Sequence, residues 1–268
     1  MIDVLSMGFF QNAIMAGALA SIACGVIGSL VVVNRQVFMA GGVAHAAYGG
    51  VGLAFYLSLP VLPCAVVFTA LAALVTAHFT FDRRERTDSF VGVLWASGMA
   101  FGVILINVTP GYNVDLMSYL FGSILAVPRS DVWVMLALDV VIVLLIRHWY
   151  SEFLSLSFDM EFARSSGIPV KRLYCLMLVL VAVAVVMVIQ VVGLILIIAL
   201  LTIPPMLAEQ RARSLAHMMI LATVYCFVFS MLGLGVAYQF DLASGASIIA
   251  VAAVSFFGVR LFQAWRLT

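Results

Sequence analysis

The sequence predicts an all-α, polytopic integral membrane protein. Of its 268 residues, 65% are hydrophobic and 9% are charged, and the mean hydropathy is +1.22. A soluble domain carries about 25% charged residues and about half apolar ones, so this chain cannot cover a globular surface with polar groups. Apolar runs of about 20 residues, the length that spans a bilayer as a helix, recur from end to end. Alternating strand patterns do not recur, which argues against a β-barrel.

Eight or nine of these apolar runs are expected to cross the membrane. The run from Leu173 to Ala208 is too long for one helix, and Gln190 and Gly193 divide it near its middle. A shorter piece, 116–127, cannot cross and is expected to be re-entrant or to lie at the membrane surface. The expected spans are 8–33, 37–58, 61–81, 89–107, 131–147, 173–190, 193–208, 215–238 and 245–263.

The basic residues predict the orientation. If Arg35 is cytoplasmic, alternate loops place twelve of the thirteen Lys and Arg residues on the cytoplasmic side, and only Arg129 falls outside. This is the asymmetry of the positive-inside rule. We therefore expect the N-terminus outside, the C-terminus inside and a multi-pass protein of the plasma (inner) membrane.

The longest cytoplasmic loop, 148–172, is predicted to contain a short helix from Asp159 to Ser165, stopped by Gly167 and Pro169. Such a helix either lies on the membrane surface or docks a cytoplasmic partner. Pro204 and Pro205 are expected to break the seventh span near its cytoplasmic end. Nothing divides the chain further, so residues 1–268 are expected to form a single transmembrane domain.

The second span contains the glycine-rich stretch GGVAHAAYGGVG, residues 41–52. Positions four apart share one face of a helix, so Gly41, His45 and Gly49 form one stripe, and Gly50 belongs to its neighbour. Small residues at this spacing let another helix approach closely. We therefore expect Gly41, Gly49 and Gly50 to pack against neighbouring helices.

His45 lies about 12 Å into this span, near mid-membrane, at 1.5 Å per residue. An ionisable residue at that depth is a candidate functional residue, and imidazole is a common ligand of late transition metals. A neutral imidazole bonded to a backbone carbonyl is the alternative. One histidine cannot hold an ion alone, and a second copy of the chain across a two-fold axis is the simplest source of more ligands.

The chain has further acidic residues and cysteines whose roles must be considered. Asp139 lies within the fifth span and must face protein or water, because an unpaired carboxylate in lipid is costly. Asp115 and Asp241 flank the expected outer mouths of the membrane pathway, where they either attract cations or are solvated loop residues. The four cysteines are scattered, with no CxxC, and are expected to pack in apolar surroundings.

Several functions are excluded by missing motifs. The chain has no GxxxxGK[ST] phosphate loop and cannot bind ATP in that manner. It has no GxSxG, HExxH or other catalytic set, and no basic patch for nucleic acid. We expect no enzyme activity and no bound cofactor.

Beside residues 41–52, four further stretches carry a family resemblance: VDLMSYLFGSILAV, MEFARSSGIPVKR, VVGLILIIALLTIPPMLAEQRARS and DLASGASIIAVAAV, at 114–127, 160–172, 191–214 and 241–254. Together they resemble the membrane permease of metal-importing ABC transporters, the zinc, manganese and iron group. The resemblance runs from about Leu5 to Phe262.

The resemblance implies a dimer of permeases, expected here as a homodimer, with two cytoplasmic ATPase subunits that bind the ATP and an extracytoplasmic metal-binding protein. It places the ATPase contact between Asp159 and Gly167, including Glu161 and Ala163. It also matches His45 to the histidine of the family's Gly-Asp-x-x-(Ser/Ala)-His motif, as a transient ligand in the pathway.

The sequence departs from this pattern at Gly41, where the family has aspartate, so a carboxylate ligand is lost. Manganese favours oxygen donors, whereas zinc accepts imidazole readily, and the departure therefore favours zinc over manganese. The family's Asp-x-Pro is also replaced, by Asp241, Leu242 and Ala243. A secondary transporter driven by an ion gradient is the alternative function, but we find no clear inverted repeat and only Asp139 well inside a span.

Overall fold

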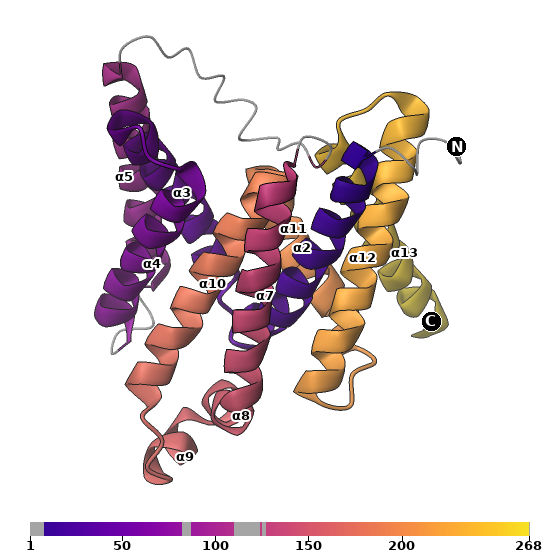
Figure 1. Ribbon diagram of the computed structural model, residues 1–268. Helices are drawn as coiled ribbons and strands as arrows, with labels where there is room; N and C mark the ends of the chain where they lie inside the picture. The colour runs from indigo at the N-terminus through magenta and orange to yellow at the C-terminus, as the bar shows by residue number, and fades with distance from the viewer. Residues whose placement is uncertain (1–7, 82–86, 110–123, 125–126, 268) are drawn as a thin grey trace. The chain divides into compact units, whose positions relative to one another are not determined.

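The computed structural model describes residues 8–81, 87–109, 124 and 127–267, and the regular structure in these residues is helical (Figure 1). Nine long helices coincide with the nine expected spans. They are α2 (Gly8–Val33), α3 (Val37–Leu57), α4 (Val61–Thr80), α5 (Thr87–Val108), α7 (Arg129–His148), α10 (Val170–Val192), α11 (Leu194–Glu209), α12 (Leu215–Phe240) and α13 (Ser244–Leu267).

Seven of these helices are long and apolar enough to cross a membrane, and the number rises to eight if α7 and the short helix α8 (Tyr150–Phe158) form one span bent by 72°. The remaining helix, α11, has 16 residues. At 1.5 Å per residue it measures about 24 Å, less than the hydrocarbon thickness of about 30 Å. The polytopic helical prediction is confirmed, with seven or eight spans by length and composition.

The described residues belong to two compact units, each treated separately below. One contains Met1–Val32, Met117–Ala137 and Gln190–Thr268, and the other contains Val33–Leu116 and Leu138–Ile189. The expected re-entrant piece at 116–127 lies almost wholly outside the described residues, and so does Asp115.

In the first unit, α11, α12 and α13 pack against one another, and glycines let the backbones of α2 and α12 come together. A Cβ atom on Gly25 would lie 2.5 Å from Cα of Thr223, and one on Gly233 would lie 2.5 Å from Cα of Ile248. Neither position has room for a side chain, so these glycines fix the spacing of α2, α12 and α13.

The two prolines of α11 lie inside the helix, which continues to Glu209, so the expected break at Pro204 and Pro205 is wrong. A proline removes one backbone donor and frees the carbonyl four residues earlier. The carbonyl of Leu200 accepts a hydrogen bond from the Cys226 thiol at 3.5 Å. Neighbouring groups can thus compensate a proline inside a membrane helix.

The break between α10 and α11 falls at Gly193, as the sequence predicts. Its φ of 83° and ψ of 167° lie in a region that is essentially restricted to glycine. The chain can therefore end one helix and begin the next without a longer loop.

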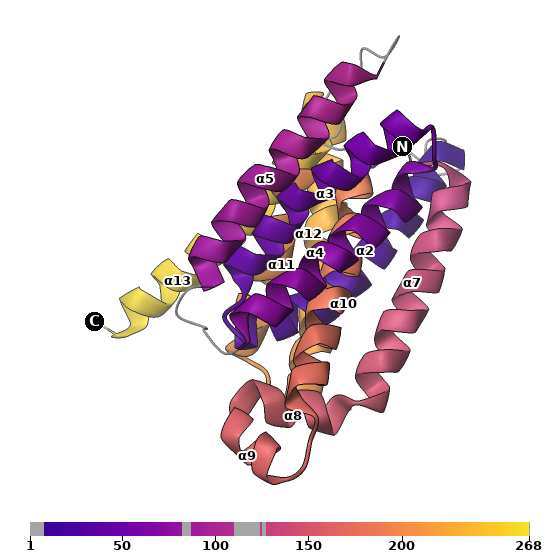
Figure 2. The same ribbon diagram turned by 90° about the vertical axis from the view of Figure 1, so that its left-hand side faces the viewer.

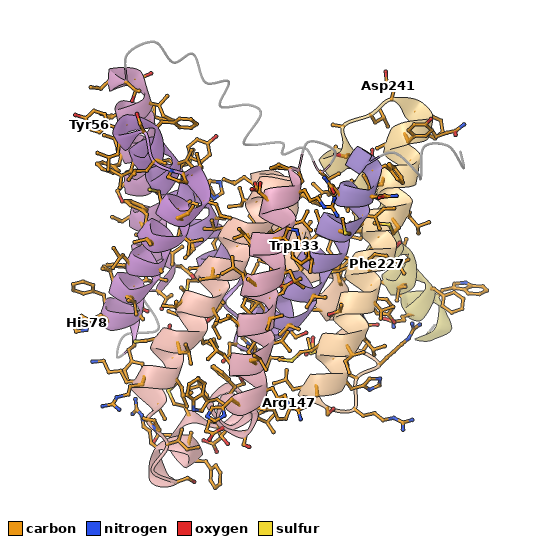
Figure 3. All side chains as sticks on the ribbon, in the orientation of Figure 1. Tyr56, His78, Trp133, Arg147, Phe227 and Asp241 are labelled. Atoms are coloured by element: carbon orange, nitrogen blue, oxygen red, sulfur yellow. The ribbon has the colours of Figure 1, made fainter. Side chains whose placement is uncertain are left out.

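In the second unit, α3 packs against both α4 and α5, and more extensively against α5. Figures 1 and 2 show these three helices side by side. The helices α3 and α4 are joined by a short turn, so Tyr56 of α3 and His78 of α4 lie at opposite ends of the pair (Figure 3). This three-helix group carries the glycine-rich stretch.

The loop after α7 contains two short helices, α8 and α9 (Met160–Ser165), which pack on each other. The prediction of α9 is confirmed. Asp159 caps its start by accepting a hydrogen bond from the backbone N–H of Phe162 at 2.9 Å. Its end is a Schellman motif. The backbone N–H of Gly167, a residue with φ of 77°, donates to the carbonyl oxygen of Arg164, and the backbone N–H of Ile168 donates to the carbonyl oxygen of Ala163. The helix α8 was not predicted from the sequence.

Candidate functional site

The contact between α3 and α5 is made by glycines on both helices. A Cβ on Gly52 would lie 2.7 Å from Cα of Gly102, and a Cβ on Gly98 would lie 2.8 Å from Cα of Ala46. Real Cβ atoms essentially never approach other atoms so closely. We call this contact the α3–α5 seam, formed by Gly42, Ala46, Gly49 and Gly52 of α3 and Val91, Gly98 and Gly102 of α5.

The glycines singled out in the sequence lie against protein. A Cβ on Gly49 would lie 2.6 Å from the Phe68 ring of α4 and 3.2 Å from the carbonyl oxygen of Gly98. A Cβ on Gly50 would lie 2.7 Å from Cα of Ala65, also on α4. Gly41 is buried, and its carbonyl is used by His45. Gly49 and Gly50 therefore let α4 and α5 lie against the backbone of one turn of α3.

His45 is half-buried, and Nδ1 of its ring lies 2.7 Å from the carbonyl oxygen of Gly41, one turn earlier. A carbonyl oxygen can only accept, so Nδ1 carries the proton of this hydrogen bond. In the neutral ring Nε2 then bears the lone pair that a metal ion requires. Across the described residues Nε2 makes no hydrogen bond.

An aromatic side chain that the sequence analysis did not single out covers one face of this imidazole. The Trp95 ring of α5 stacks on His45 with ring centroids 3.8 Å apart and an interplanar angle of 25°. The Trp95 indole in turn donates from Nε1 to the sulfur of Met99 at 3.2 Å. Trp95 and Met99 form a helical i, i+4 pair, but only the packing of α3 against α5 brings Trp95 to His45.

Of the other proposed cation-binding residues, Asp115 lies outside the described residues. Asp241 is exposed at the turn between α12 and α13, where it adopts a left-handed conformation with φ of 52° and points away from the helices (Figure 3). Within the described residues, no group of three or more His, Cys, Asp or Glu side chains is placed to hold a metal ion.

Asp139 is 3% exposed, as its position in the span predicts, and neither carboxylate oxygen has a hydrogen-bond partner in the part of the chain that the structure describes. Cys24 and Cys226 are fully buried, whereas Cys64 and Cys175 are partly exposed. The buried pair fits the packing role expected from the sequence.

The residues proposed for the ATPase contact differ in accessibility. Glu161 is exposed and forms an ion pair with Arg164 at 3.9 Å. The ring of Phe162 is 60% exposed and that of Phe158 is 72% exposed. Ala163 is fully buried, so its side chain lies on the inner face of α9 and is not exposed to a partner. Asp159 and Gly167 shape the two ends of the helix.

The helix α9 is attached to the end of α4. The guanidinium of Arg164 lies 5.4 Å from the centre of the Phe81 ring, and the Lys171 ammonium lies 6.0 Å from it, both within cation–π range. Phe81 also contacts Tyr174 of α10, with ring centroids 5.6 Å apart. This cluster connects the exposed loop to the helix that packs against Gly49 and Gly50.

Apolar helices of membrane-spanning length, packed through close glycine contacts, define a polytopic membrane protein. A family profile described as the ABC 3 transport family matches residues 6–263. The chain belongs to this family, and the resemblance found in the sequence is confirmed.

Relatives of known sequence and structure agree with this assignment. The chain is 47% identical to an uncharacterized membrane protein, slr2045, of Synechocystis, over 96% of this chain and 91% of that protein. It is 33% identical to the manganese transport system membrane protein MntC of Halalkalibacterium halodurans, over 95% and 87%. It also matches a chain of PsaBC from Streptococcus pneumoniae in complex with Fab, at 35% identity and a TM-score of 0.86, over 96% and 93%.

The chain is thus a multi-pass membrane permease of an ABC transport system and is not itself an ATPase. This decides against the alternative of a transporter driven by an ion gradient. An ABC permease works with ATP-binding subunits, so this chain is the membrane part of a larger transport system.

The α3–α5 seam predicts that bulk at Gly49 impairs transport. Gly49→Leu inserts a side chain where the Phe68 ring and the Gly98 carbonyl already lie, and overpacking typically costs about 1–3 kcal/mol. Metal uptake per folded complex should fall severalfold in reconstituted vesicles.

Gly92→Leu is the matched control, since a Cβ at Gly92 on α5 meets no atom within 4 Å. This variant should retain normal uptake. Equal uptake by the two variants would show that the seam does not limit transport.

Proposed function

We propose that the chain forms the membrane pathway of an importer for a divalent transition metal, with His45 as a transient ligand. The observation that carries this proposal is the geometry of His45. Its hydrogen bond to the Gly41 carbonyl fixes the proton on Nδ1, and Nε2 therefore keeps a lone pair that can bind a metal ion near mid-membrane. Transport requires binding that is weak enough to release the ion, and one imidazole from each protomer suits this need.

Zinc is the cargo that the donors favour. The family's aspartate is replaced by Gly41, so the stripe offers imidazole but no carboxylate one turn away. Zinc binds imidazole readily, whereas manganese prefers carboxylate and other oxygen ligands. Met99, whose thioether sulfur accepts a hydrogen bond from Trp95, is a soft ligand and adds no oxygen ligand to this region.

Manganese is the second candidate, because relatives favour it. The proteins from Halalkalibacterium halodurans and from Streptococcus gordonii, at 33% and 31% identity, are named for manganese transport. Their names support manganese as the cargo, whereas the loss of the carboxylate at Gly41 supports zinc. Gly41 is therefore the residue at which the choice of metal can be tested.

The assembly that we propose follows from the same assignment. Two copies of this chain form a homodimer, so that two His45 side chains serve one pathway. Two cytoplasmic ATPase subunits bind ATP, and an extracytoplasmic protein delivers the ion. The N-terminus lies outside and the C-terminus inside, as the distribution of Lys and Arg predicts, and residues 1–268 act as one permease domain.

The ATPase is proposed to dock on α9. Phe158 and Phe162 expose large apolar rings beside the exposed Glu161, and such rings act as anchors when a partner covers them. The contacts of Arg164 and Lys171 with Phe81 then tie the docked helix to α4. Asp115 and Asp241 are proposed only to attract cations at the outer mouths.

His45→Ala tests the pathway. The substitution removes the Nε2 donor, and metal uptake should fall to background while expression and dimer formation survive. Uptake is measured in vesicles that contain the permease and its ATPase, and is normalised to the amount of folded complex. Unchanged normalised uptake would falsify the ligand role.

Gly41→Asp tests the choice of metal. It places a carboxylate one turn from His45, and the ratio of manganese to zinc uptake should rise, because manganese favours oxygen donors. Competition between the two ions is measured in the same vesicles, with Gly41→Asn as the uncharged control. An unchanged ratio in Gly41→Asp contradicts the selectivity argument.

Phe162→Ser and Glu161→Arg test the docking site. Both side chains are exposed, so the fold should survive, while loss of an anchor at an interface should weaken ATPase binding about tenfold. Binding is measured by titrating the ATPase onto detergent-solubilised permease. Phe240→Ser is the control, since Phe240 is 68% exposed at the C-terminal end of α12 and lies outside the loop. Unaltered binding in both loop variants places the docking site elsewhere.

A further inference from the structure

The Trp95 ring contacts the His45 imidazole, and Trp95 has no part in the function proposed above. It lies on α5, on the other side of the α3–α5 seam, and it is only partly buried. Its ring stacks on the imidazole at a centroid distance of 3.8 Å. Because Trp95 is only partly buried, packing of the core alone does not account for this stacked contact. The contact therefore indicates a role for Trp95 at the site.

We propose that Trp95 is a positioning residue that holds the His45 imidazole in the orientation that binds the ion. This proposal rests on the proposed role of His45 as a metal ligand. Two contacts restrain the imidazole: the hydrogen bond from Nδ1 to the Gly41 carbonyl and the stacked indole. Together they restrict rotation about both side-chain torsions, which the hydrogen bond alone would not do.

The stack leaves the donor atom accessible. The Nε2 lone pair lies in the plane of the imidazole, whereas Trp95 covers a face of the ring, with an interplanar angle of 25°. An ion can therefore approach Nε2 along the ring plane without displacing the indole. Metal-binding histidines are commonly oriented through their other nitrogen by a second group, and here the Gly41 carbonyl has that place.

The indole is itself held in position. Its Nε1–H donates to the Met99 sulfur one turn along α5, and an aromatic ring next to a thioether is a favourable contact. The glycines of the seam, Gly98 and Gly102, remove side chains that would push α5 away from α3. The close approach of these two helices is what brings Trp95 within stacking distance of His45.

The effect of Trp95 on metal affinity follows from the strength of the stack. Aromatic pairs of this kind contribute enough to change an equilibrium constant by about three- to tenfold. Trp95→Leu should therefore raise the apparent dissociation constant for Zn²⁺ of the purified permease–ATPase complex by about three- to tenfold. Trp95→Phe keeps a ring for stacking and should stay close to the wild-type value.

The measurement is equilibrium retention of radioactive Zn²⁺ by the complex in detergent, with the folded fraction measured by size exclusion. Trp133→Leu is the control, because Trp133 is 63% exposed on α7, and its affinity should be unchanged. A Trp95→Leu complex that is folded and has wild-type affinity would overturn the proposal.

A spectroscopic measurement does not depend on whether Trp95→Leu folds. Replacement of Trp133, Trp149 and Trp265 by Phe leaves Trp95 as the only tryptophan. Its fluorescence should change on addition of Zn²⁺, and His45→Gln should abolish that change. A fluorescence that does not respond to Zn²⁺ would overturn the positioning role.

The two proposals fail in different ways. If His45→Gln retains Zn²⁺ with wild-type affinity, the ligand role of His45 fails and the role of Trp95 fails with it. If His45→Gln abolishes Zn²⁺ binding but Trp95→Leu binds normally, only the role of Trp95 fails.

Discussion

The site depends on how closely the backbones of α3 and α5 approach each other. Gly52 and Gly102 meet with no room for a Cβ atom, and Gly98 lies directly against Ala46. In a bilayer the lipid tails are as apolar as leucine, so helices associate through van der Waals packing of small residues rather than by hydrophobic burial. Without this contact His45 would have neither the Trp95 ring beside it nor a helix to face.

Close glycine contacts between helices also occur in the other compact unit. Gly25 and Gly28 have no room for side chains beside α12 and α11, and Gly233 has none beside α13. In this unit the glycine contacts accompany the two prolines of α11, whose freed carbonyls lie among close neighbours. Each unit is thus fixed by backbone contact, which resists continuous deformation and favours movement of helices as rigid bodies.

Much of the fold could be predicted from the sequence, because apolar length alone defines a membrane helix. All nine expected spans are helices, and the break at Gly193 and the helix after Asp159 follow from turn and capping residues. The continuation of α11 through Pro204 could not be predicted, since it depends on groups from other helices. Trp95 was missed for a similar reason: periodicity places it on a helix, but tertiary packing selects its partner. The burial of Ala163 likewise results from tertiary packing.

The tautomer of His45 tests this account most directly. The chain has four histidines, so solid-state NMR of ¹⁵N-histidine-labelled protein in bilayers, with His45→Gln used for assignment, can resolve this ring. The account predicts a neutral ring that is protonated at Nδ1, with an unprotonated Nε2 whose resonance shifts when Zn²⁺ is added to the complex with its ATPase. A His45 ring that is protonated at Nε2, or an Nε2 resonance that does not respond to the metal, would contradict it.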